Sequence, residues 1–129
     1  EKGPKKLWPG LADLQKKKLD PDTIDVTEMK HRLLAIQALE TARCFEEKVL
    51  TDVREADVGS ILGFGFAPFS GGTLSYIDMM GTKKFAELCA GLAKRYGPRF
   101  APSALILDMA KKGESFYTRF APARKEKAA

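Results

Sequence analysis

The chain has 129 residues, of which 44% are hydrophobic and 30% are charged, as in an ordinary soluble globular protein. Basic residues outnumber acidic ones by 22 to 17, but nine of them lie in the terminal segments, so the middle of the chain lacks the basic bias of a nucleic-acid-binding face. No apolar run reaches the roughly 18 residues of a membrane span. Two distant cysteines and one histidine favour buried free thiols over a disulfide or a zinc site.

Residues 1–26 are expected to form an extended linker or arm, because three prolines and two glycines interrupt any regular period. The apolar side chains of this arm could pack on its own domain or form a strap across a partner domain; they are Leu7, Trp8, Leu11 and Leu14. At the other end, residues 123–129 are expected to be a disordered tail. Since the chain begins with Glu1 rather than Met, we expect a piece of a longer protein.

The first long helix is predicted over residues 27–47, and its length makes it the expected central helix. Asp25 and Glu28 have the spacing of a capping box. Its apolar positions follow a helical period and form a wide face, which comprises Met29, Leu33, Leu34, Ile36, Ala38, Ala42 and Phe45. We interpret His31 as a surface residue and find no catalytic partner for Glu40.

A second helix is predicted over residues 53–62, with Asp52 as its cap and Ala56, Ile61 and Leu62 facing inward. A glycine-rich corner follows, Gly63-Phe-Gly-Phe-Ala-Pro-Phe-Ser-Gly-Gly72. Its start resembles a dinucleotide-binding loop, but Pro68 occupies the third glycine position and a helix, not a strand, precedes it. We therefore predict a shaped corner between helices and no nucleotide site.

Three further helices are predicted, over residues 73–80, 83–96 and 104–112. Gly81 closes the first, Thr82 is expected to cap the second, and Ser103 after Pro102 opens the third. The aromatic cluster Phe116, Tyr117 and Phe120 is expected to fold back onto the core. Because no segment alternates like a strand, the sequence predicts an all-α fold of about five helices.

The sequence offers no complete catalytic constellation. It has no Gly-x-Ser-x-Gly elbow, no second histidine, no cysteine beside a histidine and no carboxylate cluster with metal spacing. We therefore assign no catalytic, cofactor-binding or metal-binding residue to this chain. The residues by themselves indicate a non-catalytic helical module that binds either another domain or a ligand at its edge. The alternative is a stand-alone helical module that binds protein or nucleic acid.

Several motifs resemble one enzyme family in order and spacing. They are Ala42-Arg-Cys-Phe-Glu-Glu, Val49-Leu-Thr-Asp, Glu55-Ala-Asp57, the glycine-rich corner, Asp78-x-x-Gly81 and Tyr96-Gly97-Pro98-Arg-Phe-Ala-Pro102. Residues 27–122 resemble the helical C-terminal domain of L-3-hydroxyacyl-CoA dehydrogenases. The resemblance is closest to the second copy of this domain in fatty-acid oxidation complex alpha subunits, and Lys6 to Leu11 resembles the linker before it.

The resemblance implies a fold like the C-terminal domain of 6-phosphogluconate dehydrogenase and a parent enzyme of β-oxidation. The parent would be a bacterial-type cytoplasmic protein that combines an enoyl-CoA hydratase/isomerase with oxidation of L-3-hydroxyacyl-CoA to 3-oxoacyl-CoA by NAD. Neither His31 nor Glu40 matches the family's catalytic pair. The implied partners are the preceding helical repeat, the Rossmann domain and a thiolase subunit, and this chain alone is expected to be inactive.

We expect the corner to shape a packing face for the neighbouring repeat. The residues assigned to this face are Gly63, Gly65, Phe66, Pro68, Phe69, Gly71, Gly72, Leu74, Tyr76, Asp78 and Gly81. Four of them, Phe66, Phe69, Leu74 and Tyr76, are proposed as contact residues, also in a possible homodimer of the isolated chain. Asp78 is expected to bond to the backbone of the corner.

Overall fold

A computed structural model describes residues 3–15 and 19–120, and within these ranges every regular element is a helix. The α-helices are α1 (Val26–Glu46), α2 (Val53–Phe64), α3 (Thr73–Met80), α4 (Thr82–Tyr96), α5 (Ala104–Lys112) and α6 (Phe116–Arg119). Short 3-10 helices are η1 (Pro9–Leu14), η2 (Pro21–Thr23), η3 (Pro68–Ser70) and η4 (Pro98–Phe100). The predicted all-α class is confirmed, and α6 is the helix that the sequence analysis missed.

Side chains satisfy free N–H groups at the start of α1, α2 and α5, as the sequence predicted. Asp25 accepts from Glu28 N at 2.9 Å to open α1, and Asp52 accepts from Arg54 N at 2.8 Å to open α2. The Ser103 hydroxyl accepts from Ile106 N at the start of α5. Because the first turn of a helix has no backbone partners for its N–H groups, these caps fix where each helix begins.

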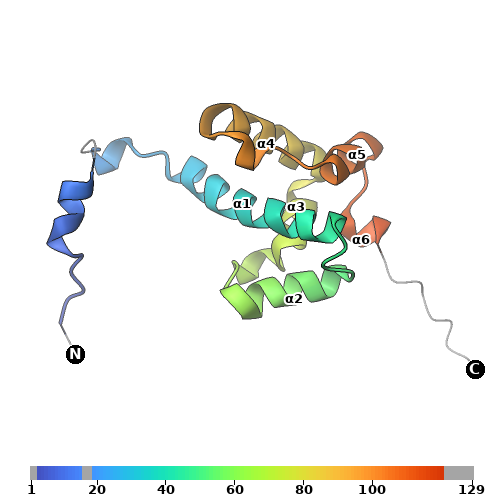
Figure 1. The fold of residues 1–129 in the computed structure, drawn as a ribbon, viewed down its shortest axis with the longest axis horizontal. Helices are drawn as coiled ribbons and strands as arrows, with labels where there is room; N and C mark the ends of the chain where they lie inside the picture. The colour runs from blue at the N-terminus through green and yellow to red at the C-terminus, as the bar shows by residue number, and fades with distance from the viewer. Residues whose placement is uncertain (1–2, 16–18, 121–129) are drawn as a thin grey trace, which may run out of the picture.

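Helix α3 is short but lies at the centre of the bundle. It packs against α1, α2, α4 and α6, and four of its eight residues are buried. Figure 1 shows α1 crossing the middle of the molecule in front of α3, with α4 and α5 on one side and α2 on the other. The hub of the bundle is therefore α3, which directly follows the glycine-rich corner, rather than the longer α1.

Helix α1 packs on this hub through small side chains. Ala35, Ala38 and Ala42 are fully buried, which lets neighbouring backbones approach closely, and Leu39 is buried beside them. Two residues of the predicted face are instead exposed: Met29 is 43% exposed and Leu33 is 59% exposed. The first turns of α1 lie at the edge of the bundle, on the side of the arm (Figure 1), so few neighbours cover them.

Helix α2 differs from the prediction at its end and on its inward face. It continues through Gly63 to Phe64 and ends at Gly65, whose φ of 75° suits a residue without Cβ. Leu62 is 81% exposed and Ile61 is half-buried, whereas Ala56 is buried as predicted. Because α2 lies at the edge of the bundle and packs on α3, one face of it is covered and the opposite face is open to solvent.

The C-terminal part of the described chain folds back on the core, as predicted. The centre of the Phe45 ring lies 4.7 Å from the centre of the Phe120 ring and 6.1 Å from that of the Phe116 ring. Both pairs of rings are in edge-on arrangements. The expected capping role of Thr82 is wrong. Its hydroxyl donates to the carbonyl of Glu114 at 2.9 Å, so it ties the start of α4 to the turn after α5, while Gly81 occupies the cap position.

The N-terminal arm projects away from the helical body (Figure 1). Leu7, Trp8 and Leu14 are all exposed, so the alternative in which the arm packs on its own domain is not observed. The predicted tail, residues 123–129, lies outside the described residues. No helix in the described part of the chain is long and apolar enough to cross a bilayer.

A matched pair of substitutions tests this assignment of the core. Leu39→Ala should lower the free energy of unfolding by about 2–5 kcal/mol, because Leu39 is fully buried and its removal leaves a cavity. The same change at the exposed Leu62 should cost no more than about 0.5 kcal/mol. Urea unfolding followed by circular dichroism measures both, and equal losses would contradict the inward and outward faces described here.

Candidate functional site

A buried carboxylate holds the glycine-rich corner in place. Asp57 lies on the covered face of α2 and is 2% exposed. Its Oδ1 accepts from Leu74 N at 2.7 Å, and its Oδ2 accepts from the Ser75 hydroxyl at 2.6 Å. The Tyr117 hydroxyl donates to the same Oδ2 at 3.0 Å. These donors, together with the N-terminal end of the α3 dipole, compensate the cost of burying the charge.

A serine and a glycine complete this contact between α2 and α3. The Ser60 hydroxyl accepts from Thr73 N at 3.2 Å and donates to the carbonyl of Asp57 at 2.7 Å. Gly72 has a φ of 124°, and a Cβ on it would lie 2.4 Å from Cβ of Asp57. A larger residue at position 72 would therefore push the carboxylate away from the helix that it caps.

Asp78 caps a helix, but not at the corner. Its two oxygens accept from Phe116 N at 2.8 Å and Tyr117 N at 3.0 Å, so it anchors α6 rather than the corner's backbone. The expected bond to the corner is wrong because Asp78 lies near the opposite end of α3, facing α6. Burial raises the pKa of Asp78 above its ordinary value of 3.8, although the two backbone hydrogen bonds act in the opposite direction.

The predicted packing face is mostly core. Phe66, Leu74 and Tyr76 are buried, and the Tyr76 ring packs edge-on against the rings of Phe66 and of Phe85 on α4. Phe69 alone of the four proposed contacts is exposed, at 75%. Of the other residues assigned to the face, Gly63 lies within α2 and Pro68 begins η3. The turns between α2, η3, α3 and α4 contain Gly65, Gly71, Gly72 and Gly81.

Another apolar surface is present where the sequence did not predict it. We call it the outer face; it consists of Val58, Leu62, Phe64 and Phe69 on α2 and η3, each more than half exposed. Large apolar side chains that remain exposed are typical of surfaces that contact another domain. The spacing of Val58 and Leu62, one helical turn apart, could have indicated this face, but the prediction had placed Leu62 in the core.

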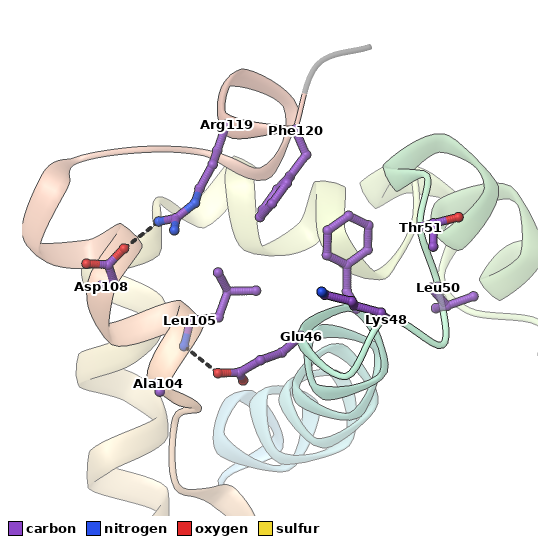
Figure 2. Close-up of a pocket in the computed structure, with 10 residues that line it drawn as sticks. Glu46, Lys48, Leu50, Thr51, Ala104, Leu105, Asp108, Arg119 and Phe120 are labelled. Carbon is purple, nitrogen blue, oxygen red and sulfur yellow. Dashed lines mark hydrogen bonds and ion pairs between the residues drawn. The ribbon is translucent and has the colours of Figure 1, made fainter.

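The cavity between α1, α5 and α6 has a volume of about 510 Å³. Its apolar lining includes Phe45, Leu50, Leu105 and Phe120, and charged groups of both signs surround it (Figure 2). The Glu46 carboxylate accepts from Leu105 N at 3.0 Å, and Arg119 pairs with Asp108 at 2.6 Å. Both interactions are internal ties between helices, and they give the cavity no group set aside for chemistry.

The titratable side chains of the described residues form no metal site. They include no cluster of three or more His, Cys, Asp and Glu side chains that could hold a metal ion. His31 lies half-buried on α1, and the exposed Glu40 pairs with Arg43 at 3.0 Å. Burial raises the pKa of the Cys89 thiol to about 12, which keeps it protonated and unreactive.

Substitutions at Asp57 test the buried cap. Asp57→Ala should destabilise the fold by about 2–4 kcal/mol, because each buried donor left without an acceptor costs about 1–3 kcal/mol. Asp57→Asn should cost less, since the amide oxygen still accepts from the α3 backbone. Asp13→Ala, at an exposed position, is the control, with a change within about 0.5 kcal/mol. If denaturant unfolding shows both Asp57 variants to be as stable as the control, the corner does not depend on this carboxylate.

The raised pKa of Asp78 predicts a pH dependence of stability. The folded protein favours the protonated carboxyl of Asp78, which therefore adds to the free energy of unfolding. This added stability is fully present below pH 3.8 and is lost as the pH rises through the raised pKa. Asp78→Asn cannot titrate, so the stability of the wild type relative to this variant should decrease over the same pH range. Thermal melts of both proteins in a pH series measure this difference, and a constant difference would contradict the prediction.

Comparison with known proteins identifies a relative of this chain. No family model matches the chain. The fatty acid oxidation complex subunit alpha of Shewanella amazonensis (strain ATCC BAA-1098 / SB2B) is 41% identical over 90 residues, which are 70% of this chain. The matched stretch is 13% of that relative, so the chain spans a small part of its length. The chain is therefore homologous to a segment of the fatty acid oxidation complex alpha subunits.

Proposed function

We propose that this chain is a non-catalytic docking domain of a β-oxidation enzyme whose full polypeptide oxidises L-3-hydroxyacyl-CoA to 3-oxoacyl-CoA with NAD. The observation that carries the proposal is the outer face. In a small helical domain with a well-filled core, large apolar side chains that remain exposed, such as Leu62 and Phe69, are suited to burial against another domain. The similarity to 13% of an alpha subunit supports the idea that the rest of a longer chain supplies this partner.

The proposed partners are the preceding helical repeat and the Rossmann domain of the same polypeptide. In this arrangement the domain stabilises the position of its neighbours and leaves the redox chemistry to them. The described residues support a role of this kind, since they contain no metal-binding cluster and the Cys89 thiol is held unreactive. A thiolase subunit would then associate with the assembled polypeptide rather than with an active site in this domain.

The arm supports the same proposal. Trp8 is 66% exposed and Leu7 is 83% exposed, although both are large apolar residues. Burying them against a preceding domain would recover about 1.5–3 kcal/mol for each fully covered large side chain. We therefore assign the arm to the strap that joins this domain to its neighbour. Trp8 is the one tryptophan in the sequence, so its fluorescence reports on docking of the arm.

Docking through the outer face can be tested with the separated parts of an alpha subunit. The wild-type chain should bind the remainder of the polypeptide, and Leu62→Ser combined with Phe69→Ser should weaken binding at least about tenfold, because two exposed apolar contacts are lost. Sedimentation and the shift of Trp8 emission measure the affinity. Leu107→Ser, at an exposed position on α5, is the matched control. Equal binding by all variants, or no binding by the wild type, would contradict the proposal.

The non-catalytic assignment has its own test. The isolated chain mixed with NAD and an L-3-hydroxyacyl-CoA should produce no NADH above background, measured by absorbance at saturating substrate. The complete alpha subunit is the positive control for the assay. NADH production by the isolated chain that increases with its concentration would show that catalytic groups are present in it.

A further inference from the structure

A second hollow lies on the opposite side of α1 from α2, between the first half of α1 and η4. It has a volume of about 280 Å³ and is lined by Met29, Arg32, Leu33, Ile36, Arg99 and Phe100. The floor is apolar, and the two polar side chains are both arginines. Neither the resemblance to dehydrogenases nor the proposed docking through the outer face assigns a role to this hollow.

The hollow has an unbalanced positive charge. None of its lining residues is acidic, and within residues 3–15 and 19–120 no carboxylate lies within 4.0 Å of the Arg32 or Arg99 guanidinium. Glu28, the acidic residue one turn before Arg32, already accepts hydrogen bonds from Arg95 and from the Tyr96 hydroxyl. This hollow thus differs from the cavity of Figure 2, in which the Arg119 guanidinium pairs with the Asp108 carboxylate.

Each guanidinium group lies over an aromatic ring, with Arg32 in the closer contact. The Arg32 guanidinium carbon lies 3.9 Å from the centre of the Tyr96 ring, and that of Arg99 lies 5.2 Å from the centre of the Phe100 ring. Arg43 fixes the backbone beneath them, since its Nη2 donates to the carbonyl of Arg99 at 2.9 Å. A stacked guanidinium keeps its N–H donors free in its plane and loses less conformational entropy when it binds an anion.

We propose that this hollow binds a small organic anion, with its carboxylate or phosphate held by Arg32 and Arg99 and its apolar part against Met29, Leu33 and Phe100. The guanidinium fork matches both kinds of oxyanion, so either head group satisfies the site. The volume lies just below the range of roughly 300–1,000 Å³ that is typical of pockets for drug-sized ligands. The ligand is therefore short, comparable to a six-carbon acid or a phosphorylated ring.

Titration of the isotope-labelled chain with four probes tests the proposal by nuclear magnetic resonance. Hexanoate and phenyl phosphate should shift the amide signals of residues 29–36 and 99–100 in a saturable manner. Hexanol, which lacks the charge, and inorganic phosphate, which lacks the apolar part, should each bind at least about tenfold more weakly. A preference for hexanoate over phenyl phosphate, or the reverse, identifies the head group for which the site is built.

Matched variants distinguish binding in the hollow from attraction to any exposed arginine. Arg32→Gln and Arg99→Gln should each weaken hexanoate binding about tenfold, whereas Arg54→Gln, on α2, should leave it unchanged. Leu33→Asp places a carboxylate in the hollow at an exposed position and should abolish binding without loss of the fold, which a thermal melt checks. The proposal is overturned if no probe saturates up to ~10 mM, if hexanol binds as well as hexanoate, or if Arg54→Gln matches the site variants.

Discussion

The buried carboxylate of Asp57 is the contact on which the rest of this fold depends. It joins the edge helix α2 to the first turn of α3, and α3 in turn packs against α1, α4 and α6. A charge that is 2% exposed persists because several donors and the α3 dipole converge on it. Gly72 is required at the same place, since a side chain there would occupy the position of the carboxylate.

The same device recurs through the domain: an acidic residue on one helix caps the start of another helix that is distant in sequence. Asp78 on α3 caps α6, and Glu46 at the end of α1 accepts from Leu105 N in α5. Tyr117 connects the two aspartates, because its N–H donates to Asp78 and its hydroxyl donates to Asp57. Helices as short as α3 and α6 are marginal alone, so these caps and the apolar packing together determine where they form.

The packing of the residues in and after the corner determines which apolar side chains remain exposed. Phe66 of the corner and Leu74 and Tyr76 of α3 fill the core, whereas Leu62 and Phe69 on the outer face remain exposed and are the proposed docking residues. The hollow with Arg32 and Arg99 lies on the other side of α1. A neighbouring domain on the outer face would leave that hollow open, so the two proposals concern separate surfaces and their tests are independent.

The sequence by itself determined the all-α class, most helix boundaries and their local caps, because apolar period and capping residues act over a few neighbouring positions. Its motifs also indicated the family that the similarity to an alpha subunit confirms. The tertiary structure decided which apolar residues are covered: α2 turns the side with Val53 and Ala56 toward the bundle, so Leu62, on the opposite side, is exposed. It also decided the partners of Asp57 and Asp78, since their bonds to residues 74 and 116 span 17 and 38 positions. No local pattern encodes such pairs, because only the packing of α3 against α2 and α6 brings their atoms together.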